Sequence, residues 1–118
     1  MIRPGVRIFV CIEAVDMRLG FDRLAQEARR RLGEDPEGGS LFVFANKAAN
    51  RVKCLWFDTN GYCLLYKRLH RAVFDLPVGR AGVSSVRIDG SALAKLLAGV
   101  EGAPHRKRYG RTERGSVR

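Results

Sequence analysis

The chain has 118 residues, of which 46% are hydrophobic and 29% charged, and these values predict one folded domain rather than a disordered chain. No stretch approaches the roughly 20 apolar residues that a membrane helix needs, and the N-terminus lacks the long apolar core of a secretory signal. We therefore expect a cytoplasmic protein with no membrane partner. The formal net charge of +10 favours an anionic partner such as nucleic acid, although a GC-rich genome would also enrich arginine.

The three cysteines are Cys11, Cys54 and Cys63, an odd number without the paired spacing of a disulfide framework or a zinc knuckle. They predict reduced thiols that pack as small hydrophobic side chains, in agreement with a cytoplasmic protein. His70 and His105 have no ligand-type residues beside them in sequence. We expect no metal site and no other cofactor.

The first elements in chain order are a strand and a helix. Residues 6–12 are apolar at nearly every position, which predicts a strand covered on both faces. The helix is predicted from apolar residues at helical spacing, which are Phe21, Leu24, Ala25, Ala28 and Leu32. Asp16 or Asp22 would serve the start of this helix, and Gly33 is its expected C-cap.

The remaining elements are mostly strands. Their predicted ranges are 40–44, 51–58, 62–69, a short strand at 72–76, and 84–89, followed by a short helix capped by Asp89 or Ser91. This order predicts an α+β domain over residues 1–103, built on a small antiparallel sheet (a β-α-β-β-β meander) with one main helix and a short C-terminal helix. Residues 104–118 hold six Lys or Arg against one Glu and predict a basic disordered tail.

The dipeptide Asn60-Gly61 is the strongest hairpin signal because both residues tolerate positive φ. A two-residue turn there would place Lys53 opposite Arg68. Like charges directly opposite destabilise a sheet, and a phosphate would relieve them, while Tyr66 beside them would stack on an unpaired base. The candidate nucleic-acid-binding residues are Arg51, Lys53, Tyr66, Lys67, Arg68 and Arg71. The alternative is that these long side chains extend into solvent at the open end of the hairpin.

The connection between the first strand and the helix is a second candidate site, for contact with a partner. Its residues are Asp16, Met17, Arg18, Gly20 and Phe21. In the alternative reading, Asp16 and Arg18 fix the connection by local hydrogen bonds, and Gly20 permits an unusual backbone angle. Asp22 at the helix start and Asp58 at the hairpin also have ordinary structural explanations. We therefore expect no catalytic site.

Four motifs in a fixed order carry a family resemblance over roughly residues 4–100. They are Val15-Asp16-Met17-Arg18 with Gly20-Phe21-Asp22 and Leu24; Leu41-Phe42-Val43-Phe44 with Asn46; Arg51-Val52-Lys53 with Leu55-Trp56, Asp58 and Gly61; and Leu65-Tyr66-Lys67-Arg68-Leu69 with Phe74 and Pro77. With this combination the chain resembles the TnpB-type accessory proteins, the second-reading-frame products of the insertion-sequence-66 group. Phe57 and His70 depart from the pattern, since relatives usually carry a second Trp and often an acidic residue there.

The resemblance implies a non-catalytic accessory protein of DNA transposition that works beside the separate transposase of the same element. It would bind DNA, the transposase, or both. The alternatives are a protein-interaction module that contacts the transposase without binding DNA, and an RNA-binding regulator of the element. Phosphate binding predicts that Arg51, Lys53, Arg68 and Arg71 form one exposed patch, whereas a protein module predicts an exposed apolar patch.

Overall fold

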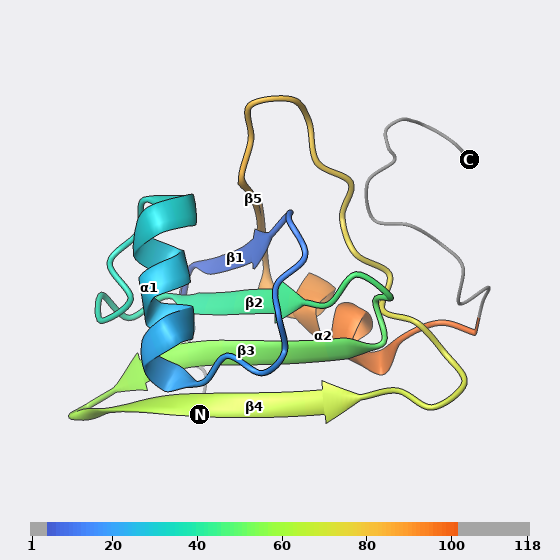
Figure 1. Ribbon diagram of the computed structural model, residues 1–118, viewed down its shortest axis with the longest axis horizontal. Helices are drawn as coiled ribbons and strands as arrows, with labels where there is room; N and C mark the ends of the chain where they lie inside the picture. Colours follow the sequence, from blue (N-terminus) through green and yellow to red (C-terminus); the bar gives the residue numbers. More distant parts are fainter. Residues whose placement is uncertain (1–4, 102–118) are drawn as a thin grey trace.

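The computed structural model describes residues 5–101, which form a five-stranded sheet with a helix on each face (Figure 1). In chain order the elements are β1 (Ile8–Cys11), α1 (Phe21–Leu32), β2 (Leu41–Ala45), β3 (Arg51–Asp58), β4 (Gly61–Arg68), β5 (Ser85–Ile88) and α2 (Gly90–Ala98). The predicted α+β class is confirmed. The tail predicted at 104–118 lies outside the described residues.

The sheet has the strand order β4-β3-β2-β1-β5 and is mixed. β2, β3 and β4 are antiparallel neighbours, but β1 and β2 run parallel, with Ile8 opposite Leu41 and Val10 opposite Val43. The prediction of an antiparallel sheet is therefore wrong for this pair. The reason is α1, because a helical crossover returns the chain to the end of the sheet where β1 began. β5 then pairs antiparallel with the other side of β1.

The helix ends follow the sequence signals in part. Neither Asp16 nor Asp22 caps α1, whose N-cap is Gly20 without a side-chain hydrogen bond. Asp22 lies in the first turn instead, where a carboxylate interacts favourably with the positive end of the helix dipole. Gly33 is left-handed (φ 66°, ψ 25°), and its N–H donates to carbonyls of the last turn, which confirms it as the C-cap. Asp89 caps α2 by accepting a backbone N–H at 2.8 Å.

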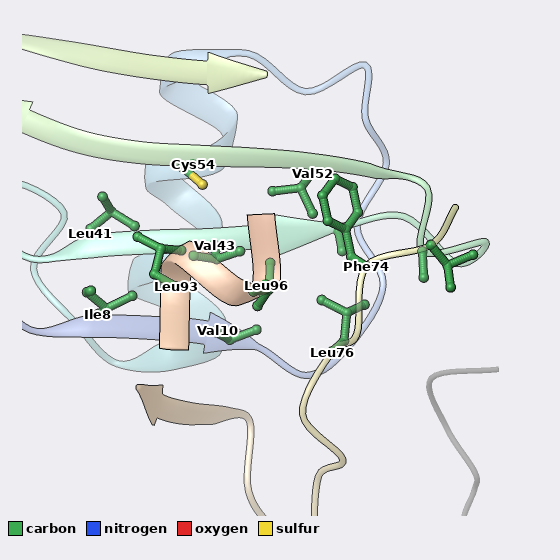
Figure 2. Packing of buried hydrophobic residues seen from close by; sticks show 13 residues of the cluster. Ile8, Val10, Leu41, Val43, Val52, Cys54, Phe74, Leu76, Leu93 and Leu96 are labelled. Atoms are coloured by element: carbon green, nitrogen blue, oxygen red, sulfur yellow. The ribbon is translucent and has the colours of Figure 1, made fainter. Parts of the chain in front are cut away.

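β1 and β2 are buried along their whole length because α1 covers one face of the sheet and α2 covers the other (Figure 1). The cluster on the α1 face comprises Phe9, Cys11, Val15, Leu24, Ala25, Ala28, Phe42, Phe44 and Leu55. Figure 2 shows the second cluster, on the α2 face, where Leu93 and Leu96 of α2 lie over Val43. The prediction that the first strand is covered on both faces is confirmed.

The β3–β4 hairpin turns at Thr59 and Asn60, not at Asn60 and Gly61 as predicted. Asp58 pairs with Gly61, so Gly61 already belongs to β4. The positive φ of the turn falls on Thr59, at 57°. An Asn-Gly dipeptide thus marks the correct hairpin, but the turn itself is displaced by one residue.

This displacement changes the predicted strand register by two residues. Lys53 lies opposite Tyr66 instead of Arg68, and Arg51 lies opposite Arg68. Because side chains alternate between the two faces of a strand, a shift of two leaves each side chain on its predicted face. The grouping of basic residues on one face therefore survives the error in register.

Residues 72–76 do not form the predicted short strand. Val73 makes only an isolated bridge to Val100, with backbone hydrogen bonds of 3.0 and 2.8 Å. Phe74 and Leu76 are buried in the cluster on the α2 face (Figure 2). Their apolar character therefore reflects packing against the sheet and not pairing within it.

Candidate nucleic-acid interface

The open end of the β3–β4 hairpin carries a group of side chains on the α1 face, which we call the basic cluster: Arg51, Lys53, Tyr66 and Arg68. The cross-strand pairs are Arg51 with Arg68 and Lys53 with Tyr66. Three of the four, Arg51, Tyr66 and Arg68, line a surface hollow of about 220 Å³. Like charges directly opposite each other disfavour strand pairing, and an anion in the hollow would offset this repulsion.

Lys53 is the buried cation of the basic cluster, with 7% of the residue exposed. Its Nζ donates to the carbonyl of Leu19 at 2.8 Å and lies 4.8 Å from the centroid of the Tyr66 ring. Within residues 5–101, no carboxylate lies within ion-pair distance of Lys53, Arg51 or Arg68. Buried charges are normally paired. The charge of Lys53 acts on the Asp16 carboxyl, but the two form no ion pair, so the three grouped cations form a site that an anion would stabilise.

Tyr66 is held in place from two sides. The ammonium of Lys53 lies over its ring, and Arg51 Nη1 donates to its hydroxyl oxygen at 3.3 Å. The residue nevertheless remains 48% exposed. The basic cluster thus combines cations with an oriented, accessible aromatic ring, a combination that suits nucleic acid.

The hydrogen bond from Lys53 to Leu19 joins the basic cluster to the second predicted site, the β1–α1 connection. There the Asp16 carboxylate accepts hydrogen bonds from Arg18, through its backbone N–H at 2.9 Å, its Nε at 3.1 Å and its Nη2 at 2.8 Å. The structure therefore contains the local hydrogen bonds of the alternative reading for Asp16 and Arg18. Gly20 has an ordinary extended conformation (φ −99°, ψ −158°), so the expected unusual backbone angle is wrong.

The other two residues of the connection differ in exposure. Met17 packs partly buried against the cluster on the α1 face. Phe21 begins α1 and is 47% exposed. Phe21 is therefore the apolar side chain of this connection that is most available to a partner.

The carboxyl of Asp16 is predicted to remain ionised far into the acidic range. Hydrogen bonds from the side chain of Arg18, then from its backbone N–H, lower the pKa of Asp16 from 3.8 to about 2, and the charge of Lys53 acts in the same direction. Because the folded-state pKa is the lower one, the stabilisation is present above about pH 4 and is lost as the pH falls towards 2. A carbon-detected NMR titration measures this pKa directly.

Arg18→Ala should return the pKa of Asp16 towards 3.8, whereas the control Arg23→Ala should leave it near 2. Arg23 is an exposed arginine of α1 that makes none of the hydrogen bonds to Asp16, so this control removes the same charge and leaves those hydrogen bonds in place. An unchanged pKa in Arg18→Ala would contradict the assigned cause.

Two predicted residues do not join the basic cluster. Lys67 points to the α2 face, where its Nζ donates to the carbonyl of Leu97 at 2.7 Å, near the C-terminus of α2. Arg71 is exposed in the loop after β4. Because Lys53 is buried, the single exposed patch of four cations expected for phosphate binding is not formed as predicted.

The sequence reasoning missed the contribution of Leu19. Its main-chain carbonyl fixes Lys53, and a main-chain acceptor leaves no signal in residue type. A further arginine on the α1 face, Arg87 of β5, lies at the opposite edge of the sheet from the basic cluster, with its guanidinium 5.5 Å from the centroid of the Phe9 ring. Neither residue has a sequence motif that indicates its position.

An apolar groove of about 760 Å³ lies on the other side of the molecule, between α2, β5 and the segment before β5. Val78 and Val100 on its walls are 69% and 39% exposed. This is the kind of feature that the protein-interaction alternative predicts.

No helix within residues 5–101 is long and apolar enough to cross a membrane. In the same part of the chain, no three His, Cys, Asp or Glu side chains are grouped as a possible metal site.

The fold and the basic cluster define a small α+β protein with a cationic sheet face, and comparison with known proteins places it in a family. Residues 6–107 match the family described as IS66 Orf2-like proteins, so the chain belongs to that family and the resemblance seen in its motifs is confirmed. It is 35% identical to the uncharacterized protein y4hO of Sinorhizobium fredii over 97 residues, which cover 82% of this chain and 83% of the relative.

A second relative, the uncharacterized protein y4jC of the same organism, is 32% identical over 103 residues, which cover 86% of each chain. No solved structure matches this chain. Family membership therefore rests on sequence, and it supports an accessory protein of transposition rather than a known class of enzyme.

Proposed function

We propose that this protein is a non-catalytic accessory factor of IS66-type transposition that binds nucleic-acid phosphate through its basic cluster, beside the transposase of the same element. Membership of the IS66 Orf2-like family supports the accessory role. The observation that carries the binding role is the grouping of Arg51, Lys53 and Arg68, which have no carboxylate partner within residues 5–101. The net charge of +10 would strengthen such binding at low salt.

In this proposal Arg51 and Arg68 contact the phosphate, because Lys53 is buried and already donates a hydrogen bond to the carbonyl of Leu19. Arg51 and Arg68 lie opposite each other on the walls of the hollow, so both guanidinium groups would contact one anion bound there. Lys53 would add a fixed positive charge beneath them. Arginine suits this position because its planar donors match the geometry of phosphate oxygens.

The test is binding to labelled terminal-repeat DNA of the element across a salt series. Arg51→Ala/Arg68→Ala removes both side chains that contact the phosphate, so it should weaken binding and reduce the slope of log K against log salt by about one. The matched control Lys47→Ala/Arg80→Ala removes the same charge from exposed loops and should leave the slope nearly unchanged. A scrambled duplex of equal length measures whether the terminal repeat is recognised by sequence.

Equal effects of the two double variants would show that net charge alone, and not the basic cluster, binds the DNA. Absence of binding even at low salt would favour the second candidate function, contact with the transposase, which the apolar groove supports. The accessory role itself is tested separately. It would be abandoned if deletion of the gene left the transposition frequency of a complete element unchanged.

A further inference from the structure

Tyr66 is an aromatic residue exposed on the face of the edge strand β4. It is 48% exposed, although Leu64 on the same strand and face packs against the cluster beneath α1. Its position opposite Lys53 puts it beside the pair of arginines. The exposed ring is therefore a feature of the cationic site and not of the core.

The contacts of Tyr66 orient the ring instead of covering it. The ammonium of Lys53 lies 4.8 Å from the ring centroid, and Arg51 holds the hydroxyl at 3.3 Å. Lys53 is itself anchored by the carbonyl of Leu19. A ring fixed in this way loses little side-chain entropy when a ligand stacks on the part that remains accessible.

We propose that the basic cluster binds an unpaired nucleotide, with its phosphate in the hollow between Arg51 and Arg68 and its base stacked on Tyr66. This inference rests on the proposed phosphate binding and adds that the bound nucleic acid is single-stranded. In a duplex the faces of the bases are covered by their neighbours, and only their edges are open to a protein. An aromatic ring on a sheet face can stack on a base only where the strand is unpaired.

The single-stranded state would therefore be recognised by the ring, and the phosphate by the arginines. Unpaired DNA and unpaired RNA share this chemistry, and the hollow contacts both through phosphate and base. A DNA oligonucleotide and an RNA oligonucleotide of the same sequence distinguish the two sources.

The experiment compares the affinities of four labelled probes by fluorescence anisotropy at one low salt concentration: a single-stranded DNA, the same sequence as RNA, its DNA duplex, and a single-stranded DNA with abasic sites. The variants are Tyr66→Leu, Tyr66→Phe and the control Tyr62→Leu. Tyr62 is a tyrosine on the same strand and face whose hydroxyl bonds Glu37, outside the hollow. Thermal unfolding of each variant confirms that it is folded.

We expect the wild type to bind a single strand more tightly than the duplex and the abasic probe. Tyr66→Leu should lose about 5- to 150-fold in affinity for the single strand, since stacking on one base is worth about 1–3 kcal/mol. It should lose little for the duplex and the abasic probe. Tyr66→Phe keeps the ring and should retain most of the affinity, as should Tyr62→Leu.

The inference is overturned if Tyr66→Leu weakens all probes equally, or if the abasic strand binds as well as the intact one. Phosphate binding would then still stand, provided that Arg51→Ala/Arg68→Ala reduces the salt dependence. If no probe binds, both the inference and the proposed DNA-binding role fail. Tighter binding of the DNA or of the RNA strand would identify the source of the nucleotide.

Discussion

Replacement of Phe42 by alanine is expected to cost about 3–5 kcal/mol of the free energy of unfolding. Phe42 lies on the central strand β2, is fully buried, and stacks on Phe9 with ring centroids 5.8 Å apart and an interplanar angle of 16°. Both faces of β2 are covered, so the surrounding structure cannot collapse easily into the space left by the ring. Small domains are stable by only about 5–15 kcal/mol, and the variant would lose a large part of this.

Urea denaturation followed by circular dichroism measures the loss. Phe21→Ala is the matched control, because the same side chain is removed from a position that is 47% exposed. The control should cost less than about 1 kcal/mol. Similar losses in the two variants would contradict the assignment of Phe42 to the centre of the core.

Gly99→Ala is expected to destabilise the protein by about 1–3 kcal/mol from backbone strain alone. Gly99 follows α2 with φ 75° and ψ 171°, a conformation open essentially only to glycine. An added Cβ would also lie 2.6 Å from Leu69 Cδ1 and 3.3 Å from the carbonyl oxygen of Val73. The side chain of Leu69 can move, but the carbonyl of Val73 belongs to the bridge with Val100 and cannot move freely.

The control is Gly90→Ala at the first residue of α2, where φ is not positive and no atom lies within 4 Å of an added Cβ. There alanine should stabilise the protein by about 0.4–1 kcal/mol, because it restricts the unfolded chain. Thermal unfolding of both variants measures the two effects. Effects of the same sign would show that the conformation at Gly99 is not required by the fold.

The local part of the fold could be predicted from residue type and spacing. β3 was predicted with its observed bounds, Arg51–Asp58, and α1 ends at Leu32 with the predicted C-cap at Gly33. These features depend on residues close in sequence, such as a run of mostly apolar residues or a glycine after a helix. Residues 72–76 show the limit of such patterns, because an apolar segment buried by packing has the same composition as a strand.

The candidate site was predictable to a similar degree. Alternation along the hairpin placed Arg51, Lys53, Tyr66 and Arg68 on one face, and an error of two residues in register did not alter that result. The burial of Lys53 was not predictable. It depends on a main-chain carbonyl 34 residues away in sequence, at Leu19.

The sequence by itself determined where the five strands and two helices lie along the chain, although it also predicted a strand at 72–76 that does not form, and it determined the face on which the basic residues gather and the family of the protein. Only the tertiary structure decided that β1 and β2 pair in parallel, that Asp16 bonds Arg18 instead of capping α1, and that Tyr66 is oriented by its neighbours. The physical reason is the distance along the sequence over which each kind of interaction acts. Periodicity and turn chemistry act between residues near in sequence, whereas strand order and buried polar contacts are set by which distant segments the packed core brings together.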